Sequence, residues 1–170
     1  MKLTPSELGH YLECDFFSGT LTWKVSTNRR VKIRSQAGCK IDASGRRFLG
    51  LKGQQILVHH AVWALAYGYW PTEIDHINRD PSDNRLTNLR EVTHAQNAKN
   101  KGVSSRNKSG FKGVSFSKNE NKYAAHIGHN NKTIRIGSYS TPELAAAAYD
   151  EKALELHKNF AVTNKTLGLI

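Results

Sequence analysis

The stretch that decides the fold is residues 58–97, which read VHHAVWALAYGYWPTEIDHINRDPSDNRLTNLREVTHAQN. Near its middle Asp75 and His76 stand side by side, and Asn88 and Asn97 follow His76 at successive intervals of twelve and nine residues. A carboxylate, an imidazole and two amides are groups that can hold a hard divalent ion beside a histidine that takes a proton from water. The spacing therefore predicts a metal-assisted hydrolytic site.

The composition indicates a folded, basic protein. A chain of 170 residues fits one ordinary domain or two small ones, and its apolar content of 38% is that of a globular protein. Residues 1–100 carry 14 Lys and Arg against 9 acids, and residues 101–170 carry 11 against 5. The net charge of +11 predicts attraction to polyanions, of which nucleic acid is the commonest soluble one. A generally basic surface without such a partner is the alternative.

Cysteine usage and hydropathy restrict the compartment. Cys14 and Cys39 lack CxxC spacing, so neither a disulfide framework nor a cysteine zinc ribbon is expected. No apolar run approaches the roughly 18 residues that a membrane span needs, and the N-terminus has no signal-peptide pattern. We expect a cytoplasmic protein, in a bacterial or phage-infected cell, with no membrane partner and no small-molecule cofactor.

Local signals predict the elements before the site. Thr4-Pro5-Ser6-Glu7 is a capping box with Pro at the first helical position, so a helix is expected to run to about Glu13. Two short runs, 47–51 and 55–58, predict a hairpin that turns at Lys52-Gly53. Residues 59–67 predict a short helix that Gly68 ends.

The site itself is predicted as a strand, a loop and a helix. Glu73–Ile77 is expected to be a strand, and residues 78–84, rich in Asn, Asp and Pro, form a loop. Residues 85–90 are expected to start a helical turn. A second capping box at 93–96 opens a helix that carries Asn97. A strand packed against this helix brings Asp75, His76 and Asn97 together.

This stretch resembles an HNH nuclease motif of the ββα-metal type, as found in phage and intron-encoded homing endonucleases. The matching segments are Val58-His59, Ile74-Asp75-His76-Ile77, Asp83-Asn84-Arg85, Asn88-Leu89-Arg90 and Gln96-Asn97. The resemblance implies that His76 is the general base and that Asp75 and Asn97 ligate Mg²⁺ or Mn²⁺. It also implies that Asn88 bonds to the loop backbone and holds His76 in its working orientation.

The other histidines have a weaker claim to a function. His59, His60 and His94 are candidates for a zinc cluster with His76, but adjacent residues of a helix point in different directions, so a shared ion is not expected. We interpret His59 as structural or phosphate-contacting. His60 stands where the family usually has Arg, so the family's contact there does not carry over.

The remainder of the chain reads as a linker and a second domain. Residues 101–109 are basic, small and polar and are predicted to be a linker, which can also follow a phosphate backbone. Three alternating runs, 111–116, 122–127 and 132–139, predict an antiparallel sheet. Thr141-Pro142-Glu143 caps a helix to about His157, on which positions 145, 148, 149, 153 and 156 form a narrow stripe facing the sheet.

Residues 110–170 resemble an AP2 DNA-binding domain, through Lys112-Gly113-Val114, Lys122-Tyr123-Ala124-Ala125, Ile136-Gly137-Ser138-Tyr139, Ala146–Asp150 and Ala161–Asn164. In that family the sheet lies in the major groove of DNA. The contacts that the resemblance implies come from Lys112, Ser115, Ser117, His126, Thr133, Arg135, Ser138 and Tyr149. Several of these positions are usually Arg or Trp in the family, so altered readout is expected. Exposed strand residues without a DNA contact are the alternative.

Together these observations predict an α+β protein with an HNH nuclease domain at 1–100, a linker at 101–109 and an AP2-like domain at 110–170. The predicted function is metal-dependent hydrolysis of phosphodiester bonds in duplex DNA, by nicking or double-strand cleavage, in a homing or mobile-element role. A monomer or weak dimer is expected. The alternatives are a non-catalytic DNA-binding regulator on an HNH scaffold and a protein directed to RNA.

Overall fold

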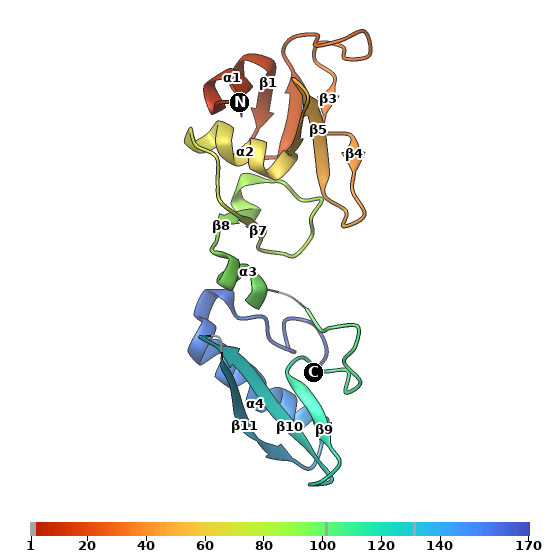
Figure 1. The fold of residues 1–170 in the computed structure, drawn as a ribbon, viewed down its shortest axis with the longest axis vertical. Coiled ribbons are helices and arrows are strands. Elements are labelled where there is room, and N and C mark those ends of the chain that lie inside the picture. The colour runs from red at the N-terminus through yellow and green to blue at the C-terminus, as the bar shows by residue number, and fades with distance from the viewer. Residues whose placement is uncertain (1–2, 101, 131) are drawn as a thin grey trace. The chain divides into compact units, whose positions relative to one another are not determined.

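The computed structural model describes residues 3–100, 102–130 and 132–170. The chain divides into two compact units, Met1–His94 and Ala95–Ile170, whose elements are labelled in Figure 1. The division falls inside α3 (His94–Lys99), ahead of the predicted linker. Of that linker, Lys101 lies outside the described residues. The part from 102 to 109 belongs to the second unit.

The first unit begins with the predicted capping box. The Thr4 hydroxyl accepts a hydrogen bond from the Glu7 backbone at 3.2 Å, and the Glu7 carboxylate accepts one from the Thr4 backbone at 2.8 Å. The resulting helix, α1 (Pro5–Tyr11), ends two residues earlier than expected. It ends there because Leu12, 2% exposed, begins β1 (Leu12–Asp15) and pairs with β2 (Thr20–Trp23).

Two small antiparallel sheets follow. β1, β2 and β3 (Gln36–Ala37) form the first sheet, in the order β1-β2-β3. The second sheet has the order β4-β5-β6 and consists of β4 (Lys40–Ile41), β5 (Arg47–Leu51) and β6 (Gln54–Leu57). The predicted hairpin turn is confirmed, since Lys52 and Gly53 join β5 to β6 with φ angles of 48° and 73°.

One helix ties these sheets into a common core. Helix α2 (Val58–Tyr67) starts directly after β6 and ends at Gly68, whose φ of 76° is the left-handed value favoured at helix ends. The predicted helix over 59–67 is thus confirmed. Its buried side chains, among them Val58, Ala61 and Val62, join a cluster that includes Leu8, Leu12, Leu21, Trp23, Leu49, Leu51 and Ile56.

The motif region folds as two strands and a helix. β7 (Ile74–His76) confirms the predicted strand, and it pairs with β8 (Leu89–Glu91) in an antiparallel ladder. The helical turn expected over 85–90 is a 3₁₀ turn, η1 (Leu86–Asn88), and the chain then extends into β8. The α3 helix completes the ββα order.

The second unit is a sheet covered by one helix. β9 (Val114–Ser117), β10 (Lys122–His129) and β11 (Lys132–Tyr139) form an antiparallel sheet in the order β11-β10-β9. Helix α4 (Pro142–His157) and the 3₁₀ turn η2 (Lys158–Phe160) follow. The predicted strands and helix are present, and the side chains that join sheet to helix are Val114, Ala125, Ile127, Ala145, Ala146, Tyr149 and Ala153.

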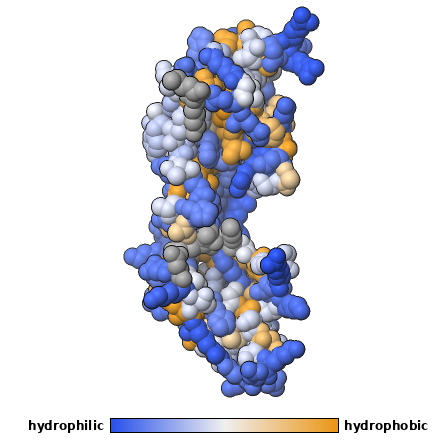
Figure 2. Space-filling view, viewed as in Figure 1, coloured by the Kyte–Doolittle hydropathy of each residue, from blue (hydrophilic) through white to orange (hydrophobic). Residues whose placement is uncertain are grey.

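The face drawn in Figure 2 is mostly polar. On the face that Figure 2 shows, hydrophobic residues form small separate groups on a hydrophilic background. Across residues 3–100, 102–130 and 132–170, no helix is both long enough and apolar enough to cross a bilayer.

Gly19 brings the β1–β2 turn close to the motif loop. A Cβ atom there would lie 2.2 Å from the carbonyl carbon of Asn84, and φ is +70°. Gly53 offers a matched control, because its φ is +73° and nothing lies within 4 Å of its Cβ position.

We expect Gly19→Ala to lower the free energy of unfolding more than Gly53→Ala. Both substitutions place a Cβ in the left-handed region, at about 1–2 kcal/mol, but only Gly19→Ala also forces backbone apart, adding about 1–3 kcal/mol. Urea denaturation of the two variants measures the difference. Equal losses would show that the contact between the turn and Asn84 is dispensable.

Candidate active site

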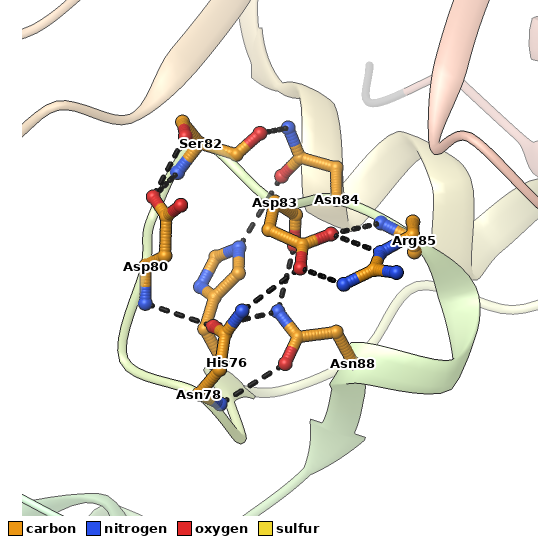
Figure 3. Close-up of polar contacts among 8 residues, drawn as sticks. All are labelled: His76, Asn78, Asp80, Ser82, Asp83, Asn84, Arg85 and Asn88. Atoms are coloured by element: carbon orange, nitrogen blue, oxygen red, sulfur yellow. Dashed lines mark hydrogen bonds and ion pairs between the residues drawn. The ribbon is translucent and has the colours of Figure 1, made fainter.

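His76 is a buried imidazole held by an amide. It is the last residue of β7 and is 8% exposed. Its Nε2 lies 3.3 Å from Oδ1 of Asn84, which is itself 3% exposed. The Asn84 amide nitrogen donates to the carbonyl of Ser82 at 3.2 Å, which fixes the amide with its oxygen toward the ring, as Figure 3 shows. An amide oxygen can only accept, so this contact places a hydrogen on Nε2.

Asn88 closes the loop around His76. Its Oδ1 accepts from the backbone N–H of Asn78 at 3.0 Å, and its Nδ2 donates to the Asp83 carbonyl at 2.8 Å and to Oδ1 of Asn78 at 2.9 Å. The backbone adds Ile77 N–H to the Asn88 carbonyl at 2.9 Å. These bonds join the two ends of the loop across the base of the site (Figure 3). The contacts match the role predicted for Asn88 toward the loop backbone.

Acidic side chains stiffen the loop from outside. Asp83 pairs with Arg85 through contacts of 2.8 and 2.6 Å, which lower the pKa of its carboxyl to about 2. Asp80 accepts from the hydroxyl and backbone of Ser82 at 2.7 and 2.9 Å, and these bonds lower its pKa as well. Both carboxyls are therefore ionised at neutral pH and stay committed to the loop.

Asp75 is held by Arg90 from the neighbouring strand. The two residues are register partners in the β7–β8 ladder, and Nε and Nη2 of Arg90 lie 2.8 and 2.7 Å from one carboxylate oxygen of Asp75. The side chain of Asp75 is 6% exposed. A buried carboxylate needs such a partner, because an uncompensated charge in this environment is costly.

His59 forms the wall behind His76. Its ring, 3% exposed, lies 4.9 Å from the His76 ring and 4.7 Å from the His60 ring, edge to face in both cases. Burial, with smaller contributions from His60 and His76, lowers the pKa of His59 to about 3. A neutral ring at this place adds no positive charge beside His76.

Burial also lowers the pKa of His76 from its ordinary value of 6.5, while the hydrogen bond to Asn84 opposes this shift. His76 is thus neutral at pH 7. A neutral imidazole with its hydrogen on Nε2 has its basic lone pair on Nδ1. Such a group can take a proton from water, which is what the sequence predicted for it.

The residues predicted to hold a metal ion lie in different units. Asp75 belongs to the first unit, and Asn97, on α3, belongs to the second, so the role of Asn97 stays a prediction. Within the described part of the chain, no three His, Cys, Asp or Glu side chains gather in a way that could hold a metal ion. A zinc cluster among the histidines is therefore not formed there. His94 instead lies 3.3 Å from Glu73 at the surface.

The predicted DNA-contacting residues of the second unit mostly share one face. Val114, Ala125 and Ile127 point toward α4, and residues alternate across a strand, so the opposite face is directed away from the helix. Ala125 pairs with Gly137 but His126 pairs with Arg135, so β11 has one extra residue at this bulge. The alternation of side chains along β11 is therefore displaced by one position there. The predicted residues on the face away from α4 are Ser115, Ser117, His126, Thr133, Arg135 and Ser138.

Two of the predicted contacts are placed differently. Tyr149 is 5% exposed, packs with Ile127 and Ala153, and lies so close to Gly113 that a Cβ there would be 2.1 Å from its ring. The prediction that Tyr149 contacts DNA is corrected, because its ring is part of the core. Lys112 lies in the turn before β9, where its backbone exchanges hydrogen bonds with the Asn164 side chain at 2.7 and 3.2 Å.

Sequence reasoning missed three partners of the predicted residues. Asn84 is only part of a quoted motif, Arg90 falls in a predicted helical turn, and Glu120 lies between two predicted strands, 111–116 and 122–127. Glu120 pairs with Arg135 and accepts from Ser138, while Arg135 also donates to the Ser138 hydroxyl at 2.6 Å. The signal for Arg90 was its position opposite Asp75, which is visible only once β8 is recognised as a strand.

Comparison with known proteins bears on this site. The HNH endonuclease family model matches residues 57–99, the span from the end of β6 to the end of α3. An uncharacterized HNH endonuclease, L560, of Acanthamoeba polyphaga mimivirus is 38% identical over 111 residues. That match covers 64% of this chain and 57% of the relative, so the chain spans little more than half of that protein's length.

Two further relatives extend the comparison. Protein 3.8 of Escherichia phage T7 is 33% identical over 105 residues, covering 61% of this chain and 86% of the phage protein. The ethylene-responsive transcription factor WRI1 of Arabidopsis thaliana is 31% identical over 124 residues, covering 69% of this chain but 29% of the factor.

Among solved structures, one titled for DNA binding and cleavage by the HNH homing endonuclease I-HmuI aligns over 87% of this chain and 86% of its own, with 20% identity and a TM-score of 0.42. A TM-score below 0.5 does not establish a shared fold. Residues 57–99 thus match the HNH endonuclease family, and the chain is similar to two viral proteins, one of which is named as an HNH endonuclease.

Two substitutions at Asn84 should move the pKa of His76 in opposite directions. Asn84→Ala removes a hydrogen bond that raises this pKa, so the pKa should fall. Asn84→Asp places a carboxylate beside the ring and favours the imidazolium, so the pKa should rise by about one unit or more. NMR titration of the His76 ring protons measures both. Shifts in the same direction for the two variants would contradict a direct contact between Asn84 and the ring.

Proposed function

We propose that this chain is a metal-dependent DNA endonuclease that hydrolyses phosphodiester bonds, with His76 as the general base. The observation that carries the proposal is the setting of His76: a buried, neutral imidazole whose Nε2 is fixed by Asn84 and whose loop is closed by Asn88. A histidine with a purely structural role needs a hydrogen-bond partner for its ring nitrogen. It does not need a neighbouring buried carboxylate such as Asp75, which is itself paired with Arg90.

The proposed chemistry starts from Nδ1, the ring nitrogen of His76 that carries no hydrogen. With hydrogen on Nε2, Nδ1 of His76 takes a proton from water as the water oxygen bonds to phosphorus and the bond from phosphorus to the leaving sugar oxygen breaks. The Asn84 contact keeps the ring from turning and stabilises the imidazolium that forms. His59, being neutral, does not oppose that charge.

Asp75 and Asn97 are the proposed ligands of a divalent ion, Mg²⁺ or Mn²⁺. A carboxylate and an amide oxygen fit a hard ion that takes few protein ligands. When bound, such an ion neutralises charge at the phosphate and stabilises the leaving oxygen. Arg90 contacts one carboxylate oxygen of Asp75, and a carboxylate has lone pairs enough to serve two cations. Arg90 thus orients Asp75.

The same ion pair supports a second candidate, a DNA-binding regulator that does not cleave. If Arg90 alone compensates Asp75, the carboxylate needs no metal ion, and the nuclease motif serves as a scaffold. The two candidates differ in one measurable property, because only the nuclease consumes supercoiled DNA in the presence of a divalent ion.

The second unit is proposed to bind duplex DNA through the sheet face that lies away from α4, as AP2 domains do. The partial similarity to a plant transcription factor supports this part of the proposal. Arg135 is the residue best suited to read a guanine edge from this face. Glu120 and Ser138 hold its guanidinium in place. A homing or mobile-element role in a phage setting belongs to the same proposal, and the viral relatives support it.

His76→Ala should abolish cleavage of supercoiled plasmid in Mg²⁺ or Mn²⁺, lowering the rate by about a hundredfold or more because the general base is lost. His94→Ala is the matched control, since its side chain is 93% exposed and lies at the surface. EDTA should stop the unaltered protein. Accumulation of open circles would identify nicking by a monomer, and direct linearisation would identify a paired cut. Full activity of His76→Ala would exclude His76 as the base.

Arg135→Ala should weaken binding to a specific duplex by about tenfold, the value of one good base contact. Lys152→Ala removes the same charge from α4, where Lys152 pairs with Glu155 at 2.8 Å, and should change affinity little. Gel-shift titration on a duplex selected from a random pool compares the two variants. Equal losses in both would mean that the sheet face has no special part in binding.

A further inference from the structure

A cavity of about 500 Å³ lies beside the edge strand of the second unit. Part of its wall is the chain before β9, and part is β9 itself with the residue that follows it. The residues that line it and that matter here are Arg106, Lys108, Phe116, Lys118 and Tyr123. Its volume is that of a site for a small organic molecule or one nucleotide.

Hydrogen bonds hold the wall of the cavity in place. Asn107 donates through its amide to the carbonyls of Phe111 and Val114 at 2.8 and 3.3 Å, and accepts from the backbone of Gly110 at 2.9 Å. The Ser109 hydroxyl donates to the same Val114 carbonyl at 2.8 Å. These bonds fasten residues 107–110 onto the start of β9. Arg106 and Lys108 therefore project from a fixed segment.

The cavity carries an uncompensated positive charge. Arg106, Lys108 and Lys118 are exposed, and none of them has an ion-pair partner among residues 3–100, 102–130 and 132–170. No Asp or Glu of these ranges lines the cavity. Three cations around one hollow attract an anion with more than one charge, such as consecutive phosphates.

An aromatic platform lies in the same cavity. Phe116 is 49% exposed, and its ring packs edge to face against Tyr123, its partner across the β9–β10 ladder, with centroids 5.1 Å apart. Tyr123 holds the Phe116 ring in place and leaves about half of that residue to solvent. An exposed, supported ring beside cations is the arrangement on which proteins stack unpaired bases, because every base has a flat apolar face.

We propose that this cavity, defined by Arg106, Lys108, Phe116, Lys118 and Tyr123, binds single-stranded DNA, with one unpaired base stacked on Phe116 and the neighbouring phosphates on the three cations. The face proposed to bind duplex DNA lies on the other side of the sheet, and Ser115 at the edge strand is the one residue of that face that also lines the cavity, whereas Arg135 does not. The cavity is thus a second nucleic-acid site, suited to a strand that has come out of the duplex. Binding of single-stranded DNA in this cavity does not depend on whether the sheet face binds duplex DNA.

The test is fluorescence anisotropy of a labelled oligothymidylate of about 12 nucleotides with the full chain. Phe116→Ala should raise the dissociation constant about tenfold through loss of one stacked base, and Phe116→Trp should bind at least as tightly as the unaltered protein. Leu154→Ala is the control, since Leu154 is 57% exposed on α4 and does not line the cavity. Lys118→Gln should reduce the salt dependence by about 0.7 in the slope of log K, whereas Lys165→Gln, outside the cavity, should not.

The outcomes separate this inference from the proposed duplex binding. Phe116→Ala should leave duplex affinity unchanged, and Arg135→Ala should leave oligothymidylate affinity unchanged. No binding of oligothymidylate by the unaltered protein, equal weakening by Phe116→Ala and Leu154→Ala, or weakening by Phe116→Trp equal to that of Phe116→Ala would overturn the proposal. Displacement of the oligonucleotide by thymidine monophosphate at equal nucleotide concentration would also overturn it, by identifying a site for free nucleotides.

Discussion

The hydrogen bonds of the Asn88 amide hold the motif in one shape. A short loop that joins β7 to β8 leaves backbone groups near a buried imidazole, and unpaired polar groups there are costly. Asn88, at the end of the loop, satisfies a backbone N–H near its start and a carbonyl in its middle. One side chain thereby fixes the loop, the strand register and the place of His76. Substitutes of similar shape cannot serve, because a carboxylate lacks the donor and an alkyl group lacks both.

Around this closure three charged or polar groups of the site each have a partner of their own. Asp75 has Arg90, Asp83 has Arg85, and His76 has Asn84. Asp75 and the loop residue Asp80 favour the protonated ring and raise the pKa of His76, but by less than burial lowers it. Because burial lowers the pKa of His76, the neutral form of its ring is favoured. The chemistry of the proposed base follows from this separation of charges, since a histidine already protonated at neutral pH could not accept a proton.

Local signals in the sequence predicted the elements that local forces determine. The box at Thr4 caps a helix, Lys52-Gly53 turns a hairpin, and Gly68 ends a helix, since each rests on the conformation of a few neighbouring residues. The sequence did not predict β8, because three residues become a strand only by pairing with β7. Without β8, the pair of Asp75 and Arg90 could not be predicted either. For Tyr149 the local signal was the better guide. Helical spacing put this residue on the stripe that faces the sheet, and its ring is buried there. The burial disagrees with the DNA contact that the resemblance implied.

If both units bind DNA as proposed, the boundary inside α3 has a consequence for how they act on one DNA molecule. The second unit begins at Ala95, within a six-residue helix, so no separate segment of the chain lies between the two units as they are divided. Once one unit has engaged a DNA molecule, the other is confined to its neighbourhood at a high effective concentration. Two contacts linked in this way reinforce each other. Selection can therefore tune residence on the target through the length of this junction, without altering a residue that touches DNA.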